Sequence, residues 1–233
     1  MTEILSNLPE AIILCGGKGE RLRPITNDFP KPLVKICDKP ILHYVISHLM
    51  QHGVNRIYIA SGYKSDMIMK YIKSSNYGAN IEIYNSGDVD IIKRIQDILV
   101  TVKNDILVLY GDTISNVDIN DLVLSHRLSS KKVTMTVWPL KIAYGLVDIL
   151  SDGTVDSFAE KPTLDKWINI GYFYINKNNY DLIFDNDTFE DFLQQSANNG
   201  SINAFKHPGD HITVNTLSDL EEAQKNIKNI ITE

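Results

Sequence analysis

The chain has 233 residues, of which 43% are hydrophobic and 22% are charged. A chain of this length and apolar content can bury a sizeable core, so we expect residues 1–233 to form a single domain, with residues 1–9 as a short N-terminal extension. The formal net charge of −6 argues against a nucleic acid or a membrane as the partner. Residues 1–9 lack the apolar segment of a signal peptide and no run is long enough to span a bilayer, so we expect a cytoplasmic location.

Apolar runs of strand length alternate with segments of helical periodicity along the chain. We expect strands at Ala11–Cys15, Arg56–Ser61, Ile81–Tyr84, Asp105–Tyr110, Val133–Trp138, Tyr144–Leu150, Val155–Glu160 and Gly171–Ile175. We expect helices at Pro40–His52, Ser65–Ser74 with Ser65 as N-cap, Asp90–Val102, Val117–Ser129, Phe189–Gln195 and Asp219–Ile231. This alternation predicts an α/β protein, a Rossmann-like three-layer α/β/α arrangement around a mostly parallel, mixed sheet.

A glycine-rich loop with several basic residues follows the first predicted strand. Gly16, Gly17 and Gly19 leave room for backbone N–H groups to approach a phosphate chain. Positive charge comes from the same region, at Lys18, Arg21, Arg23 and Lys31. Because ligands of open parallel sheets bind at the carboxyl ends of the strands, the loop predicts a triphosphate site.

Other interpretations of the loop fit less well. The dinucleotide pattern G-x-G-x-x-G requires a third glycine and an acidic residue about 20 positions further on, and neither is present. The Walker pattern G-x-x-x-x-G-K-[ST] is also absent. A glycine-rich turn without any ligand remains the simplest alternative.

Five short motifs follow one another along the chain, and together they resemble the sugar-nucleotide pyrophosphorylases. They are Gly16-Gly-x-Gly-x-Arg-Leu22, Lys31-Pro32-Leu33, Lys39-Pro40-Ile41-Leu42, Gly111-Asp112 and Glu160-Lys161-Pro162. The resemblance runs from Ala11 to about Ala223 and implies a nucleotidyltransferase that joins a nucleoside triphosphate to a sugar 1-phosphate. Three further segments resemble the glucose-1-phosphate cytidylyltransferase branch and favour CTP: Gly62-Tyr63-Lys64, Lys206-His207-x-Gly209 and Asn215-Thr216-Leu217.

Asp112 is the candidate ligand of Mg²⁺. It directly follows an apolar strand and Gly111, so it should project toward the glycine-rich loop, and Mg²⁺ binds carboxylates together with substrate phosphates. The alternative is that Asp112 only caps the turn. The resemblance implies a second metal ligand at Asn215, where family members usually have Asp. Asp210 and Asp219 are the alternative candidates for this second metal ligand. The simpler interpretation is that Asp210 is an ordinary turn residue and Asp219 an ordinary helix-start residue.

The resemblance also assigns residues to the two substrates. The nucleotide would contact Cys15, Gly16, Gly17, Gly19, Arg21, Lys31, Gly87 and Gly111. The acceptor would contact Tyr144, Gly145, Glu160, Lys161, Asn169 and Gly171, with Lys161 receiving the acceptor phosphate. The chain departs from the family at Ala143, where Arg is usual, and at Asp88–Ile92, where small residues are usual. We expect Lys93 and Arg94, which follow, to lie on a solvated helix face.

The implied mechanism is direct displacement at the α-phosphorus by an acceptor phosphate oxygen. The catalytic candidates are Arg21, Lys31, Asp112 and Lys161; the first two would neutralise the departing pyrophosphate. The alternatives are guanylyl or thymidylyl transfer, a phosphorylated acceptor other than a sugar, and a non-catalytic nucleotide-binding subunit. A dehydrogenase fits least well.

The two cysteines, Cys15 and Cys37, form neither a disulfide framework nor a metal motif. Family relatives commonly self-associate, so a homo-oligomer is possible.

Overall fold

The computed structural model describes residues 8–231, so most of the expected N-terminal extension lies outside the described residues. The central sheet has seven strands in the order β12-β8-β11-β6-β1-β4-β5. Their bounds are β1 (Glu10–Cys15), β4 (Arg56–Ser61), β5 (Asn80–Asn85), β6 (Ile106–Tyr110), β8 (Val133–Lys141), β11 (Thr163–Ile175) and β12 (Ile202–Lys206). Strands β6, β1, β4 and β5 run parallel, and β11 pairs antiparallel with both β6 and β8. The predicted mostly parallel, mixed sheet is confirmed.

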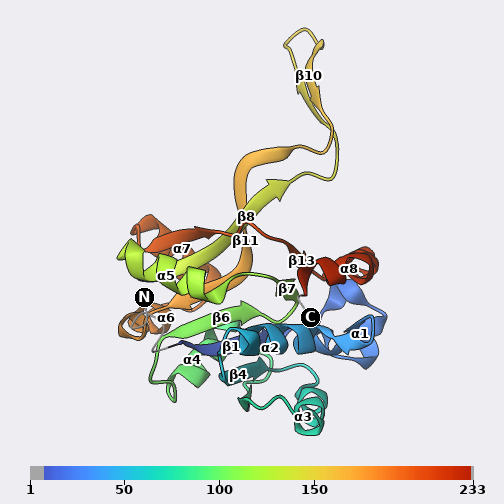
Figure 1. The fold of residues 1–233 in the computed structure, drawn as a ribbon. Coiled ribbons are helices and arrows are strands. Elements are labelled where there is room, and N and C mark those ends of the chain that lie inside the picture. Colours follow the sequence, from blue (N-terminus) through green and yellow to red (C-terminus); the bar gives the residue numbers. More distant parts are fainter. Residues whose placement is uncertain (1–7, 232–233) are drawn as a thin grey trace.

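Helices lie on both faces of this sheet (Figure 1). They are α1 (Ile25–Asp28), α2 (Ile41–Gln51), α3 (Ser65–Ser74), α4 (Ile91–Leu99), α5 (Ile119–Ser129), α6 (Asp181–Phe184), α7 (Phe189–Asn198) and α8 (Leu217–Ile230). Short 3₁₀ helices are η1 (Glu20–Leu22), η2 (Lys31–Leu33) and η3 (Lys177–Asn179). The remaining strands are short pairs outside the main sheet: β2 (Lys35–Ile36) with β3 (Lys39–Pro40), β7 (Thr113–Ser115) with β13 (His211–Thr213), and β9 (Leu146–Ile149) with β10 (Val155–Ala159).

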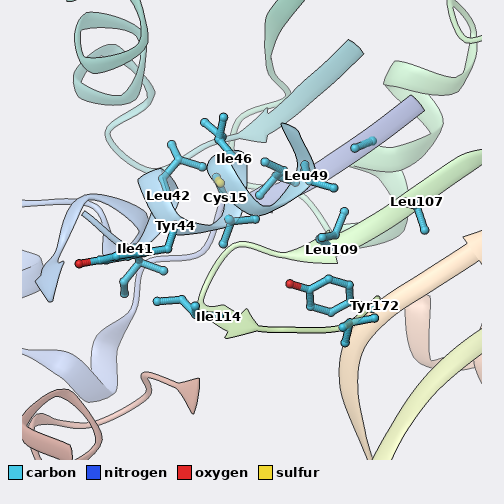
Figure 2. Close-up of a cluster of buried hydrophobic side chains, with 14 of the residues drawn as sticks. Cys15, Ile41, Leu42, Tyr44, Ile46, Leu49, Leu107, Leu109, Ile114 and Tyr172 are labelled. Carbon is cyan, nitrogen blue, oxygen red and sulfur yellow. The ribbon is translucent and has the colours of Figure 1, made fainter. Parts of the chain in front are cut away.

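The central strands are buried on both faces, which explains their continuous apolar sequences. In β1, Ala11, Ile13 and Cys15 belong to one hydrophobic cluster, whereas Ile12 belongs to the other. The first cluster packs β1 and β6 against α2, α5 and α8, and Figure 2 shows part of it around Leu42. The second cluster packs the opposite face against α4 and α7. The three-layer arrangement therefore follows from the alternation of side chains along each strand.

Several local expectations need correction. Ser65 does not cap α3; the N-cap residue is Lys64, and the Ser65 hydroxyl instead lies 2.7 Å from the Ser61 hydroxyl. Strand β11 begins at Thr163 rather than at Gly171. Strands β7, β12 and β13 were not predicted, because short segments paired with distant residues carry little periodicity of their own. Within residues 8–231, no helix is both long and apolar enough to cross a membrane.

Residues 139–168 form a two-stranded extension that we call the arm. Figure 1 shows it leaving the sheet along β8 and β11 and ending in the β9–β10 hairpin, far from the helices. The predicted turn at residues 151–153 is confirmed: Gly153 has φ 89°, and its N–H donates to the Leu150 carbonyl. The rest of the described chain is called the body below.

Candidate active site

A pocket of about 540 Å³ lies where β1 and β6 end, which is where a parallel sheet usually holds its ligand. Residues from the glycine-rich loop, from the 3₁₀ helix η2 and from the end of β6 meet there. The pocket is lined by Leu14, Cys15, Gly16, Gly17, Gly19, Glu20, Arg21, Lys31, Pro32, Ile91, Arg94, Tyr110, Gly111, Asp112 and Asn215. Seven of the eight residues predicted to bind nucleotide are among them; Gly87 is not.

A polar network joins four of the predicted site residues within this pocket. The Lys31 ammonium lies 2.5 Å from Asp112 Oδ2 and 2.9 Å from Asn215 Oδ1. Arg21 Nη2 donates to the same Asn215 oxygen at 2.9 Å. These residues come from η1, η2, the end of β6 and the segment before α8, and the fold brings them together from positions up to 194 apart in sequence.

The network places two side-chain oxygens around one positive charge. Asp112 directs a carboxylate oxygen and Asn215 an amide oxygen at the Lys31 ammonium. Oxygen ligands of this kind, with one carboxylate, suit Mg²⁺ when substrate phosphates supply further ligands. Asp219 does not take part: its carboxylate accepts from the N–H groups of Asn215 and Thr216 and so closes the capping box of α8. No group of three or more His, Cys, Asp or Glu able to hold a metal occurs among residues 8–231.

Two glycines at the pocket are required by close contacts. A Cβ atom on Gly111 would lie 2.5 Å from the Leu14 carbonyl oxygen, and the Gly111 N–H donates to that same oxygen. A Cβ atom on Gly16 would lie 2.3 Å from the Arg94 guanidinium. Gly17 has nothing within 4 Å of such an atom, so its position is open toward the pocket.

Arg94 was expected on a solvated helix face, and that expectation is wrong. Its side chain is 5% exposed and lies beneath the glycine-rich loop, where it donates to the carbonyl oxygens of Ser61 and Val89. Burial lowers the pKa of its guanidinium. Lys93 does behave as expected, with an exposed ammonium 2.9 Å from Asp97. Sequence reasoning missed Arg94 because only the glycines at positions 16 and 62 leave space for it.

The acidic segment after β5 contacts the glycine-rich loop. Lys18 of that loop pairs with Asp88 at 2.7 Å, and both groups are exposed. The pair lowers the pKa of the Asp88 carboxyl and raises that of the Lys18 ammonium. Gly87, beside Asp88, has φ 75°, and a Cβ atom on Gly62 would lie 2.7 Å from its carbonyl oxygen. This segment therefore lies against the glycine-rich loop and outside the pocket lining.

The predicted acceptor residues are divided between two places. Asn169 donates to the Tyr110 hydroxyl at 3.4 Å, and Gly171, with φ 79°, allows the Tyr110 ring to lie against its backbone. Tyr110 lines the pocket, so these two residues border it. Tyr144, Gly145, Glu160 and Lys161 lie instead on the arm and do not line the pocket. Sequence reasoning also missed Tyr110, which has the pattern of an ordinary strand residue.

The burial of the site cysteine makes it a poor nucleophile. Cys15 is 2% exposed, and burial raises the pKa of its thiol, so the thiolate is disfavoured. Cys37 is exposed and free. The pocket therefore provides cations, the carboxylates of Glu20 and Asp112, an amide and backbone groups, a set suited to polyphosphates and to direct group transfer.

Comparisons with known proteins agree with this chemistry. Residues 10–229 match the family model described as nucleotidyl transferase. The chain is 34% identical to a glucose-1-phosphate cytidylyltransferase of Salmonella typhimurium, over 90% of this chain and 92% of that protein. It is 32% identical to a D-glycero-alpha-D-manno-heptose 1-phosphate guanylyltransferase of Campylobacter jejuni, over 80% and 86%. Its fold is similar to the crystal structure of HddC from Yersinia pseudotuberculosis, with a TM-score of 0.75, 26% identity, and coverage of 94% and 100%.

Proposed function

Because the chain belongs to the nucleotidyl transferase family, we propose that it transfers a nucleoside monophosphate from a nucleoside triphosphate to a sugar 1-phosphate and releases pyrophosphate. The resemblance to sugar-nucleotide pyrophosphorylases is thereby confirmed, and the protein is an enzyme of that type. The observation that carries the proposal is the network of Arg21, Lys31, Asp112 and Asn215 at the carboxyl ends of β1 and β6. We further propose that residues 10–231 act as one nucleotidyltransferase domain.

The proposed reaction is an in-line displacement. An oxygen of the acceptor phosphate forms a bond to the α-phosphorus, the bond between the α-phosphorus and the bridging oxygen breaks, and that oxygen leaves with pyrophosphate. The acceptor oxygen is already ionised at neutral pH, so no protein base is required. Catalysis then rests on positioning the two phosphates and on stabilising negative charge.

Each residue of the network has a task in this reaction. Arg21 and Lys31 would neutralise charge that develops on the departing pyrophosphate. The N–H groups of the loop at Gly16, Gly17 and Gly19 would cradle the phosphates. Asp112, with Asn215, would hold Mg²⁺, which supplies further charge neutralisation on the phosphates when it is bound.

We propose CTP as the nucleotide, with GTP or dTTP as the alternative. The relative of Salmonella typhimurium is named for cytidylyl transfer, and the chain is similar to it over 90% of its length. The relative of Campylobacter jejuni is named for guanylyl transfer at nearly the same identity, which keeps the alternative open. The segment Asp88–Ile92 departs from the family pattern where the nucleobase would be expected to bind. The preferred nucleotide is therefore determined by comparing turnover with the different nucleoside triphosphates.

The test is pyrophosphate release with Mg²⁺ from CTP, GTP, dTTP, UTP and ATP, each combined with a set of sugar 1-phosphates. We expect turnover with CTP, and an Asp112→Asn variant should lose at least about 100-fold in kcat/KM. A matched control is Asp66→Asn, because Asp66 lies exposed on α3 outside the pocket. Turnover that survives in Asp112→Asn contradicts the metal assignment. Absence of turnover with every pair, in a protein that still binds a triphosphate, contradicts the proposed acceptor class.

A further inference from the structure

Two short strands outside the main sheet, β7 and β13, lead directly to the proposed metal ligands. Strand β7 begins at the residue after Asp112, and β13 ends two residues before Asn215. The strands pair antiparallel, with Thr113 opposite Thr213, and they lie side by side in Figure 1. The pairing continues past both strands, because the Val214 N–H donates to the Asp112 carbonyl at 3.1 Å. The course of this β7–β13 ribbon therefore decides whether Asn215 arrives beside Asp112.

A ribbon of three residue pairs is too short to fix its own register. Two-stranded ribbons are marginally stable in water, and a slip of one residue moves every side chain to the opposite face. Such a slip in β13 would bring Val214 or Thr216 to the place of Asn215, whose amide oxygen accepts from Lys31. A valine side chain has no oxygen to offer at that place. Ile114 and Val214 belong to the hydrophobic core, so they hold the ribbon near the pocket, and its far end requires contacts of its own.

The far end of the ribbon is closed by three groups that meet at one oxygen atom, the carbonyl of Asp210. The Ser115 hydroxyl donates to this oxygen at 3.0 Å, and the Asn116 N–H donates at 3.4 Å. Nε2 of His207 lies 3.2 Å from the same oxygen and 3.2 Å from the Ser115 hydroxyl. Because a carbonyl oxygen only accepts, Nε2 carries the ring proton and donates. We call Ser115, Asn116, His207 and Asp210 the clasp.

The histidine of the clasp is buried and uses one ring nitrogen. His207 is 3% exposed and Ser115 is 2% exposed. Burial lowers the pKa of His207, so the ring is neutral at pH 7. The second ring nitrogen, Nδ1, is buried without a hydrogen-bond partner among residues 8–231. The hydrogen bonding of this ring therefore runs through Nε2, toward β7 and the residue before β13.

The turn that carries His207 is held against β7 and β8. The Asp210 N–H donates to Asn116 Oδ1 at 2.9 Å, and the Trp138 indole N–H donates to the Gly209 carbonyl at 2.9 Å. A Cβ atom on Gly209 would lie 2.3 Å from Asn116 Oδ1, so the turn packs directly on the residue that follows β7. The sequence motif that contains His207 has no task in the proposed reaction, yet it fastens β13 to β7.

We propose that His207 is a positioning residue, which through the clasp fixes the register of β7 and β13 and so holds Asn215 beside Asp112. This inference rests on the proposed function and adds the group that sets the geometry of its two metal ligands. His207 does not line the pocket, so it acts through Ser115 and Asp210 and not on the substrates. Removal of a contact that orients metal ligands typically changes metal affinity or activity by about 10–100-fold.

The Mg²⁺ dependence of turnover tests the proposal. His207→Leu removes the donor, whereas the amide nitrogen of His207→Gln replaces it. We expect the Mg²⁺ concentration for half-maximal turnover to rise roughly 10-fold in His207→Leu and to return toward the wild-type value in His207→Gln.

The matched control for this measurement is His126→Leu. His126 is also buried, its Nδ1 lies 2.9 Å from the Thr134 hydroxyl, and its helix α5 packs against β8, β11 and β12. The control thus loses a buried hydrogen bond of the same kind, and its Mg²⁺ dependence should stay that of the wild type. Equal Mg²⁺ dependence in His207→Leu and His126→Leu, or no recovery in His207→Gln, overturns the proposal.

Hydrogen exchange of the Val214 amide, followed by NMR, tests the register without turnover. This N–H donates to the Asp112 carbonyl, so it should exchange at least about 10-fold faster in His207→Leu and at the wild-type rate in His126→Leu. Ser115→Ala removes a different donor of the clasp with little loss of volume, and it should also accelerate this exchange. Wild-type exchange in Ser115→Ala and in His207→Leu overturns the proposal. Faster exchange in a protein whose wild type turns over no pair of substrates counts against the proposed reaction alone.

Discussion

The pocket and the arm differ in how their residues are held. In the pocket, the side chains of Arg21, Lys31 and Asp112 are fixed by partners from distant parts of the chain, and Gly16 and Gly111 have no room for a Cβ atom. On the arm, β9 and β10 contact mainly each other, and their side chains are exposed. The difference indicates that the proposed nucleotide-binding residues are held within the body. The proposed acceptor lysine, Lys161, lies instead on the arm, whose terminal strands β9 and β10 pair with each other.

The largest expected effect separates the two halves by kinetics. Lys31→Ala removes the cation shared by Asp112 and Asn215, so kcat/KM for the nucleotide should fall by roughly 10²–10³-fold. Lys161→Ala should raise KM for the acceptor while the Kd of the nucleotide stays unchanged, since Lys161 does not line the pocket. Initial rates measure kcat/KM for the nucleotide and KM for the acceptor, and equilibrium binding measures the Kd of the nucleotide. Lys166→Ala, at an exposed lysine of the same arm, is the control; weaker nucleotide binding in Lys161→Ala would contradict the division.

The second prediction concerns the rigidity of the pocket. Gly111→Ala places a methyl group 2.5 Å from a backbone oxygen of β1, which cannot move without disturbing the sheet. The free energy of unfolding should fall by about 3 kcal/mol, the upper end for overpacking. Gly17→Ala, in the same loop but with nothing within 4 Å, should change it by less than about 0.5 kcal/mol. Urea denaturation compares the two variants, and equal stabilities would mean that the backbone around Gly111 moves aside without cost, which would contradict the rigidity of the pocket.

The third prediction concerns the buried cation beneath the loop. Arg94→Lys keeps the charge but replaces the two guanidinium nitrogens that donate to Ser61 and Val89 by one ammonium nitrogen, which cannot occupy both positions, so one carbonyl loses its partner. We expect a loss of about 2 kcal/mol in the free energy of unfolding and weaker nucleotide binding. Lys93→Ala breaks only an exposed ion pair with Asp97 and should cost less than about 0.5 kcal/mol. If Arg94→Lys left the free energy of unfolding unchanged, the Arg94 side chain would not be needed to hold the glycine-rich loop at Gly16.

The elements predicted most accurately from the sequence are those whose apolar pattern is set by their own burial. Strand β4 and helix α3 have the predicted bounds because apolar residues repeat at the period of each element. The glycine-rich loop and Asp112 were also placed at the pocket, since a residue that follows a central strand lies at its carboxyl edge. Their roles in catalysis remain predictions.

The sequence failed where tertiary contacts decide the conformation. Arg94 is buried only because Gly16 and Gly62, from two other segments, leave space for it. The first half of β11, with Asp165 and Lys166, has no apolar alternation and is extended because it pairs with β8. Lys161 precedes this strand on the arm and does not line the pocket, which no local pattern could indicate. The role that its motif predicts for Lys161 stays a prediction.

The smallest effect of a single substitution concerns the pH dependence of the stability of the body. Burial lowers the pKa of His48 and His211 to about 4, whereas a histidine of the unfolded chain titrates near its ordinary pKa of about 6.5. Between these values the unfolded chain binds more protons, so the free energy of unfolding should fall as the pH falls, by up to about 1.4 kcal/mol per pH unit for each histidine. Urea denaturation from pH 7 to pH 5 measures this slope.

Substitution of one histidine assigns the slope to the body. His211 packs against Trp138 with ring centroids 4.6 Å apart, near His207, Asp210 and Lys141, and His211→Phe keeps an aromatic ring there while removing its titration. The slope between pH 6.5 and pH 5 should then decrease by up to about 1.4 kcal/mol per pH unit. A slope that is unchanged in His211→Phe would contradict the assignment to His211.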